Sequence, residues 1–355
     1  MQKVLRAIIP SLILCSFGAF IAYAQVSTTS EDIPLPATTP FSIRNAVPQP
    51  ITRIIQPITI IATPSSPSPG QSVTVEVQTP TIEPYGANFI WTIDGTSRPD
   101  ISGFGKNTFT YTAAEVGSAK RVSVRVEPTG KTPFDASQTI YTTDLVLTWT
   151  AKTYTPKWYK GKALSVPNST VRIAAIPTFI VDGSIIPPNR LIYTWNVNGN
   201  RMLKGTGKQV FELQTPEQSW DTPIVIVEIK DMEQRVRKEV PIGIVSQQTR
   251  AVIYQTLPLG GVEFRRGTPA FPSTAPSIVD LQAEPFFFNT QSKYDLSYQW
   301  SVQSTIATSS PKNPFILTLD MQQQPPSDIP VSVIIQSKKD DAVPLASYFI
   351  SIPIH

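Results

Sequence analysis

Two short segments of the chain combine aromatic with basic residues, a mixture suited to gripping an anionic or sugar-rich polymer. They comprise Trp158, Tyr159, Lys160 and Lys162 in the first segment, and Phe264, Arg265 and Arg266 in the second. Aromatic rings stack on apolar faces and on cations, while cationic side chains form charge-assisted hydrogen bonds with anionic groups. We call these the aromatic-basic segments and predict that they bind a polymer. The alternative is structural: the aromatic residue plugs the end of a domain or the joint between two domains, with the cations on the rim.

Few other residues of the sequence could do chemistry. The chain has one histidine, His355 at its last position, and one cysteine, Cys15. This excludes histidine-based triads and makes most transition-metal sites improbable. None of the 26 acidic residues stands out as a catalytic pair, although a hydrolase with an unrecognised carboxylate site stays an alternative. We therefore predict no enzyme, no metal and no cofactor.

Two glycine-rich segments invite comparison with a phosphate-binding loop. Gly103-Phe-Gly-Lys106 and Gly205-Thr-Gly-Lys208 have the lysine but not the spacing of that loop, and neither lysine is followed by Ser or Thr. Strand-like residues come next, where a phosphate loop would open a helix. Both segments are predicted to be glycine turns that lead into a strand.

The N-terminus predicts export. Residues 1–24 combine Lys3 and Arg6 with an uncharged apolar stretch and end in Ala22-Tyr23-Ala24, the pattern of a cleavable signal peptide. If the signal segment is not cleaved, we expect it to be the one part of the chain that contacts the membrane. Residues 25–57 hold six prolines in 33 residues and are predicted to form an extended linker. The expected location is the cell surface, a periplasm-like space or the medium.

A repeat organises the rest of the chain. Trp91, Trp195 and Trp300 lie 104 and 105 residues apart, and each follows an aromatic residue by two positions. A β-branched run comes after each tryptophan at nearly constant distance: Val124, Val227 and Val333 follow at 33, 32 and 33 residues. The three tryptophans stand in the middle of alternating strands, so we predict that they form the cores of three copies of one domain.

Within each copy, short runs of alternating polarity are separated by Pro, Gly, Asn or Asp. Val73-Thr-Val-Glu-Val77 is a clear strand with period two, and Asp94-Gly95 and Asn198-Gly199 are typical of hairpin turns. No long window beyond the signal has a helical period. The predicted fold is all-β, with three tandem β-sandwiches at residues 58–143, 144–247 and 248–355. The charged hairpin from Lys230 to Lys238 is expected to be a solvated edge that discourages strand addition.

The sequence resembles the immunoglobulin-like modules of bacterial secreted proteins. The resemblance lies in the segments Ser65-Ser-Pro-Ser-Pro-Gly-Gln-Ser-Val-Thr-Val75, Phe89-Ile-Trp-Thr-Ile-Asp-Gly95 and Gly103-Phe-Gly-Lys106, and it covers residues 58–355. The chain is also similar to exported proteins of candidate-phyla bacteria. The paired cysteines of antibody domains and the Asp-Phe-Gly-Asp-Gly signature of polycystic-kidney-disease modules are absent from the sequence.

Together these features predict a non-catalytic protein of the cell surface or envelope, a structural and binding module in adhesion or in an appendage scaffold. The formal charge is +4 without a long basic run, so nucleic acid is not expected as a partner. Envelope or surface proteins are the expected partners, with an anionic polysaccharide as a further one. The alternatives are a protein that binds envelope polysaccharide or cell wall, and the hydrolase named above.

Overall fold

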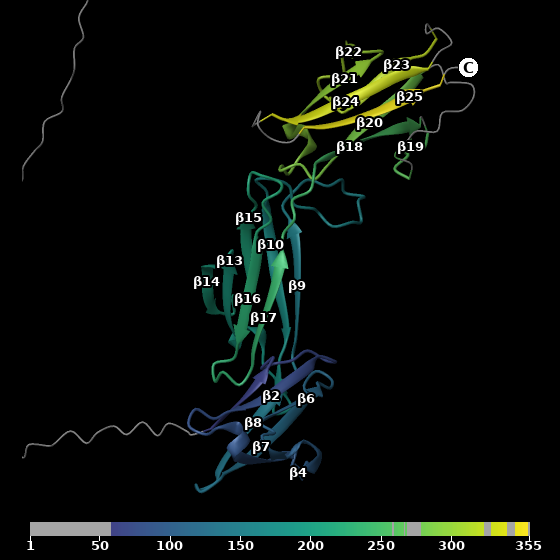
Figure 1. Ribbon diagram of the computed structural model, residues 1–355. Coiled ribbons are helices and arrows are strands. Elements are labelled where there is room, and N and C mark those ends of the chain that lie inside the picture. The colour runs from purple at the N-terminus through teal and green to yellow at the C-terminus, as the bar shows by residue number, and fades with distance from the viewer. Residues whose placement is uncertain are drawn as a thin grey trace, which may run out of the picture. The chain divides into compact units, whose positions relative to one another are not determined.

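The computed structural model describes residues 58–257, 259–265, 267, 278–322, 328–338 and 345–353. The predicted signal peptide and linker, Arg266 and His355 lie outside these residues. The described chain forms β-sandwiches of antiparallel strands, as predicted, and Figure 1 shows each as a separate group of arrows.

The first sandwich pairs its strands in the order β1-β2-β6 in one sheet and β4-β3-β7-β8 in the other, with β5 also paired to β3. Its strands are β1 (Thr59–Thr63), β2 (Ser72–Gln78), β3 (Ala87–Ile93), β4 (Thr96–Ser97), β5 (Gly103–Phe104), β6 (Thr108–Thr112), β7 (Ala119–Pro128) and β8 (Phe134–Tyr141).

The second sandwich repeats this plan, with the orders β15-β10-β9 and β14-β13-β16-β17 and an added hairpin of β11 and β12. Its strands are β9 (Asp144–Ala151), β10 (Thr170–Thr178), β11 (Ile180–Val181), β12 (Ser184–Ile185), β13 (Ile192–Val197), β14 (Asn200–Thr206), β15 (Val210–Gln214), β16 (Ile224–Lys230) and β17 (Arg237–Gly243).

The third sandwich has the orders β19-β18-β20-β23 and β22-β21-β24-β25. Its strands are β18 (Arg250–Leu257), β19 (Gly261–Val262), β20 (Ile278–Phe286), β21 (Leu296–Val302), β22 (Thr305–Ala307), β23 (Ile316–Asp320), β24 (Ile329–Ser337) and β25 (Ala346–Ile352). Short 3₁₀ turns precede the tryptophan strands or follow them: η1 (Pro84–Gly86), η2 (Pro99–Ile101), η3 (Pro188–Arg190) and η4 (Lys293–Asp295). No helix within the described ranges has the length and apolar character needed to span a bilayer.

The repeated tryptophans occupy equivalent places in the three cores. Each is at most 1% exposed and sits on the strand β3, β13 or β21. Each also faces the valine identified by the repeat: the pairs are Trp91 with Val124, Trp195 with Val227, and Trp300 with Val333. The spacing of 32 or 33 residues is therefore the length of chain between two paired strands of one sheet.

The indole N–H of each tryptophan has a backbone partner that the sequence did not reveal. Trp91 Nε1 donates to the carbonyl of Lys106 at 2.9 Å, and Trp195 Nε1 donates to that of Lys208 at 2.8 Å. In the third copy Trp300 Nε1 donates to Pro314 at 3.0 Å. The first two carbonyls belong to the glycine segments, where Gly105 and Gly207 have φ of +70°. These segments are turns, as predicted, and they close the core by accepting the indole proton.

The hairpin from Lys230 to Lys238 differs from the expectation of a solvated edge. Asp231 is 3% exposed and Lys238 is 8% exposed, so both are buried. Lys238 lies on β17 in phase with the apolar Val240 and Ile242, which pack against the core of the second sandwich. The prediction was wrong for these two side chains because oxygen atoms of the preceding sandwich receive the Lys238 ammonium, and because Arg235 and the backbone N–H of Val236 donate to the Asp231 carboxylate.

Candidate functional site

The two aromatic-basic segments meet. Trp158, from the loop after β9, stacks on Phe264, from the loop after β19, with ring centroids 4.3 Å apart and planes at 25°. Tyr254 on β18 packs edge-on against both rings, at 5.7 Å from Trp158 and 5.3 Å from Phe264. The contacts of Trp158 with Phe264 and Tyr254 join the second sandwich to the third. The contact between Tyr254 and Phe264 lies within the third sandwich and supports them. Stacking of this kind stabilises a folded protein by about 0.5–1.5 kcal/mol per pair, in addition to the contribution from buried apolar area.

A smaller apolar cluster extends this contact. Phe286 and Phe287, at the end of β20, are buried together with Val166 of the second sandwich. Tyr159 packs edge-on against both phenylalanines, at 5.5 and 5.9 Å. The backbone adds two hydrogen bonds across the same place, from Tyr154 N to Phe288 O at 2.8 Å and from Phe287 N to Tyr154 O at 2.7 Å. We call this set of contacts the second joint.

The cations of the aromatic-basic segments that the structure describes lie outside the second joint. Lys160, Lys162 and Arg265 are all exposed. The Nζ atom of Lys162 lies 3.2 Å from the ring centroid of Trp149 on β9, a cation–π contact within the second sandwich, and desolvation there lowers the pKa of Lys162. Rings and cations are thus separated: the rings are half-buried and turned toward one another, and the charges face solvent. This is the arrangement of the structural alternative, and it leaves the exposed cations as the accessible part of the predicted polymer site.

The first and second sandwiches meet at another set of contacts, the first joint, which centres on Lys238. Its Nζ atom donates to Ser66 O at 3.2 Å, to Ser68 Oγ at 2.8 Å and to Thr143 O at 2.9 Å. Arg237 N donates to Ser66 Oγ at 2.9 Å beside it. Three oxygens satisfy the three donors of the ammonium, which is what a buried lysine requires. Desolvation lowers the pKa of Lys238 all the same.

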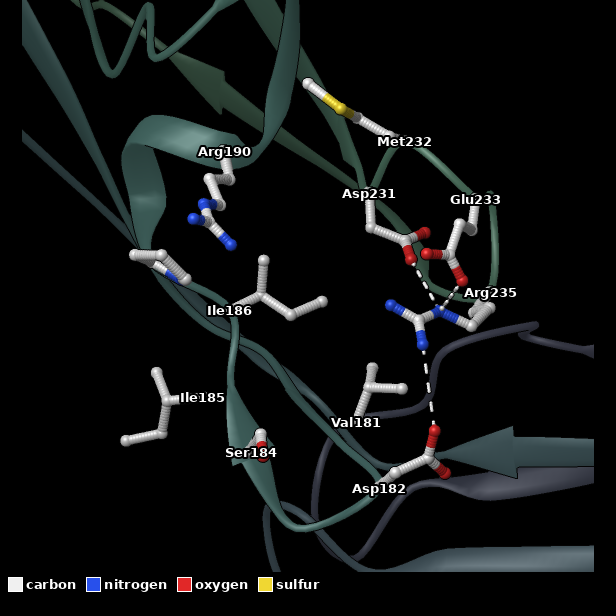
Figure 2. Close-up of a pocket in the computed structure, with 11 residues that line it drawn as sticks. Val181, Asp182, Ser184, Ile185, Ile186, Arg190, Asp231, Met232, Glu233 and Arg235 are labelled. Carbon is white, nitrogen blue, oxygen red and sulfur yellow. Dashed lines mark hydrogen bonds and ion pairs between the residues drawn. The ribbon is translucent and has the colours of Figure 1, made fainter.

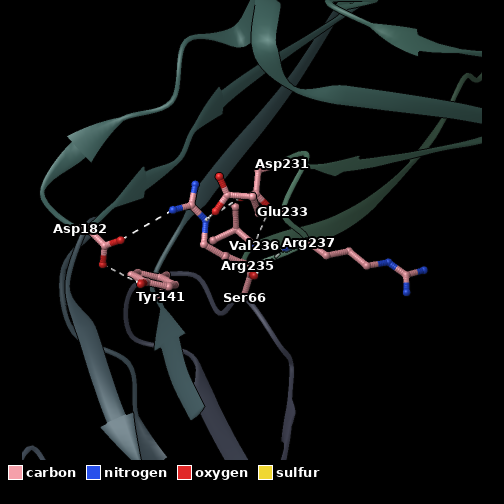
Figure 3. Close-up of polar contacts among 8 residues, drawn as sticks. All are labelled: Ser66, Tyr141, Asp182, Asp231, Glu233, Arg235, Val236 and Arg237. Atoms are coloured by element: carbon pink, nitrogen blue, oxygen red, sulfur yellow. Dashed lines mark hydrogen bonds and ion pairs between the residues drawn. The ribbon is translucent and has the colours of Figure 1, made fainter.

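A second polar group of the first joint surrounds Arg235, as Figure 3 shows. Its Nε atom lies 2.9 Å from the buried carboxylate of Asp231 and 3.1 Å from Glu233. Its Nη1 atom lies 3.7 Å from Asp182, and Asp182 in turn accepts a hydrogen bond of 2.8 Å from Tyr141 Oη of the first sandwich. The hydrogen bond to Asp231 contributes most to raising the pKa of Arg235 above its ordinary value. A chain of contacts therefore leads from Tyr141 through Asp182 to the hairpin.

A hollow of about 420 Å³ lies beside this group, between the β11–β12 hairpin and residues 231–235. In Figure 2 the carboxylates of Asp231 and Glu233 converge on Arg235, while Arg190 stands apart without a partner among the residues drawn. Ile185 and Met232, 69% and 66% exposed, supply an apolar rim. Since its carboxylates are already paired with Arg235, the hollow offers a ligand little beyond Arg190 and this rim. Within the described ranges, no group of three or more acidic, cysteine or histidine side chains is placed to hold a metal ion.

The sequence analysis did not identify the residues of the first joint, although the sequence pattern contains one sign of them. On β17 a charged residue, Lys238, falls in phase with apolar positions of an alternating strand. Glu284 on β20 is also buried, at 2% exposure, but it lies in phase with the polar Asp280 and Gln282, so the same signal does not mark it. Both faces of β20 are buried at its end because the loop of the second sandwich covers the outer face there.

Comparison with known proteins finds only distant likenesses among solved structures. No protein-family model matches the chain, and no curated protein matches its sequence. Among solved structures, the three N-terminal domains of the bacteriophage RB49 highly immunogenic outer capsid protein are 12% identical, with a TM-score of 0.26, over 83% of this chain and 97% of that one. The central fibronectin-III array of RIM-binding protein is 12% identical, with a TM-score of 0.30, over 84% and 96%. A Bacteroides ovatus protein from a mixed-linkage glucan utilization locus, SGBP-B, in complex with a heptasaccharide, is 9% identical, with a TM-score of 0.22, over 82% and 64%.

Proposed function

We propose that the chain is a non-catalytic, exported protein of the cell surface or envelope, in which jointed sandwiches form a structural and binding module for adhesion or for an appendage scaffold. Its domains would follow the limits 58–143, 144–247 and 248–355, and its partners would be envelope or surface proteins. The similarity to exported proteins of candidate-phyla bacteria stays a prediction.

One observation carries this proposal: the most distinctive side chains outside the cores are used to join one sandwich to the next. Trp158 stacks on Phe264 in the second joint, and Lys238 binds oxygens of the preceding sandwich in the first joint. Specific joints hold successive modules in a defined relation, which a scaffold needs. A chain of independent binding modules would need only flexible linkers.

In the experiment, intact source cells are treated with a protease that cannot enter them, and degradation of the chain is followed by immunoblot. The proposal predicts that the chain is degraded while a cytosolic marker survives. In parallel, the purified chain is crosslinked in its own envelope fraction, where specific protein partners are expected. A chain that resists the protease and fractionates with the cytosolic marker contradicts the proposal.

The alternative, binding to an anionic envelope polysaccharide, is supported by the exposed Lys160, Lys162 and Arg265 around the second joint. Co-sedimentation of the purified chain with protein-stripped envelope polymer tests it. Salt-sensitive binding that is lost in the triple change Lys160→Ala, Lys162→Ala and Arg265→Ala favours this function. The matched control changes Lys204, an exposed lysine of β14, to Ala. Absence of binding by the unchanged chain leaves the scaffold proposal standing alone.

A further inference from the structure

A hollow of about 370 Å³ lies against the second joint and shares Tyr154, Trp158 and Phe264 with it. Residues of both adjoining sandwiches line it, among them Tyr154, Trp158, Phe264, Glu284, Lys293 and Tyr294. Its walls combine aromatic rings with a buried carboxylate. Concave sites with apolar walls and a few converging polar groups are the usual places where proteins bind small ligands.

The buried carboxylate is only half satisfied. The Glu284 side chain is 3% exposed, and its Oε1 atom accepts from Gln282 Nε2 and, at 2.8 Å, from Lys293 Nζ. Its Oε2 atom is buried and has no hydrogen-bond partner. An acceptor left in this state destabilises the fold by about 1–3 kcal/mol, so an unmet Oε2 calls for an explanation.

A second residue that lines the hollow has a hydrogen-bond donor without an acceptor. Trp158 Nε1 is buried without an acceptor, in contrast to the indoles of Trp91, Trp195 and Trp300, each of which donates to a backbone carbonyl. Stacking on Phe264 fixes the plane of the Trp158 ring, and its N–H lies in that plane. Two residues that line the hollow thus each have a buried polar atom without a partner, a carboxylate oxygen in Glu284 and an indole N–H in Trp158.

We propose that this hollow binds a neutral saccharide unit, with ligand hydroxyls donating to Glu284 Oε2 and accepting from Trp158 Nε1. A hydroxyl group is both donor and acceptor, so neighbouring hydroxyls of a sugar supply what the two atoms lack. The rings of Tyr154 and Tyr294 offer apolar surface to the C–H face of the sugar. A cation is less suitable, because Lys293 already offsets the charge of Glu284.

Ligand entry requires a small movement. Neither polar atom meets open solvent, so a hydroxyl reaches them from the hollow once a side chain at its rim has turned. Tyr294 is 56% exposed, and Lys157, another lining residue, is exposed. Side chains of this kind change rotamer within nanoseconds. The inference goes beyond the scaffold function, and that proposal stands or falls independently of it.

The test is nuclear magnetic resonance of the indole N–H groups in the full chain, titrated with tetrasaccharides of glucose, mannose, galactose and N-acetylglucosamine. The Trp158→Phe variant identifies the Trp158 signal by its loss. At least one tetrasaccharide is expected to shift this signal while those of the three core tryptophans stay in place. Glu284→Gln should weaken the binding at least tenfold, and Lys204→Ala, at an exposed position of β14 outside the hollow, should leave it unchanged.

Two results overturn the inference. If no tetrasaccharide of the panel moves the Trp158 signal, the two atoms are completed by water or by a local adjustment. If a sugar binds equally well to the Glu284→Gln variant, whose thermal unfolding shows it to be folded, the contact lies elsewhere. A titration with a sulfated tetrasaccharide separates binding by the exposed cations, which Glu284→Gln leaves intact and salt weakens.

Discussion

The ammonium group of Lys238, on a strand of the second sandwich, lies 2.9 Å from the carbonyl oxygen of Thr143, at the end of the first. Lysine is seldom buried without a partner, and here Ser66 and Ser68 complete the set of acceptors. A charge buried at this place ties the two sandwiches together with directional bonds, where an apolar side chain would give contact without orientation.

Replacing Lys238 by Met should weaken the first joint. The change removes the ammonium donor from the carbonyls of Ser66 and Thr143, of which Ser66 O keeps a 3.5 Å hydrogen bond from Thr143 Oγ1, and we expect a loss of about 1–3 kcal/mol in the free energy of unfolding. Denaturant unfolding and the rate of limited proteolysis between residues 143 and 144 measure it. Lys204→Met, at an exposed position, is the control and should change neither. Equal behaviour of the two variants would show that the buried contacts do not hold the joint.

The indole hydrogen bonds should likewise stabilise the cores of the three sandwiches. Trp195→Phe removes the donor to Lys208 O and leaves a small cavity, so we expect a loss of roughly 2–4 kcal/mol. Trp220→Phe is the matched change at a side chain that is 79% exposed, and its effect should stay within about 0.5 kcal/mol. Denaturant unfolding followed by circular dichroism measures both. A small effect of Trp195→Phe would mean that the core does not depend on the turn that accepts the proton.

Alkaline pH should destabilise the protein through its buried tyrosines. Burial raises the pKa of Tyr193 to about 12, and its hydroxyl donates to Pro188 O at 3.1 Å. The unfolded chain releases this proton near pH 10, so the stabilisation is complete below pH 10 and is lost as the pH rises to about 12. Tyr111 and Tyr154 also have pKa values raised to about 12 by burial and add to the same decline.

Tyr193→Phe tests this linkage. At pH 8 the variant should be less stable by about 1 kcal/mol, the value of one hydrogen bond. Between pH 10 and 12 its stability should fall less steeply than that of the unchanged chain. Tyr85→Phe, at a side chain that is 90% exposed, should leave the slope as it was. Identical slopes for all three proteins would contradict the assignment of Tyr193 to the alkaline transition.

The sequence predicted most of the fold because the fold is repeated and the signals are local. The alternating strands, the hairpin dipeptides and the spacing from Trp91 to Val124 each depend on a short stretch of chain, and three copies reinforced one another. Asp94 and Asn198 do adopt the positive φ expected of them, at 50° and 48°. A strand's own pattern also explains why the three tryptophans are buried.

The joints could not be predicted in the same way. Nothing local in the sequence says that Trp158 will meet Phe264, because the contact depends on how two sandwiches dock after each has folded. Lys238 and Glu284 were missed for a related reason: each is a charged residue at a position that becomes buried only when the neighbouring sandwich covers it. The phase of Lys238 with apolar neighbours on β17 was the one available sign, since Glu284 on β20 lies in phase with the polar Asp280 and Gln282.

The central claim is that the aromatic-basic segments form a joint, and a double-mutant cycle on Trp158 and Phe264 tests it most directly. Unfolding free energies of the full chain, of Trp158→Ala, of Phe264→Ala and of the double variant are compared. Because the two rings belong to different sandwiches, their changes interact only if the joint exists in solution. We predict a coupling energy of about 0.5–1.5 kcal/mol. Strict additivity, with each change felt only in its own sandwich, would contradict the account.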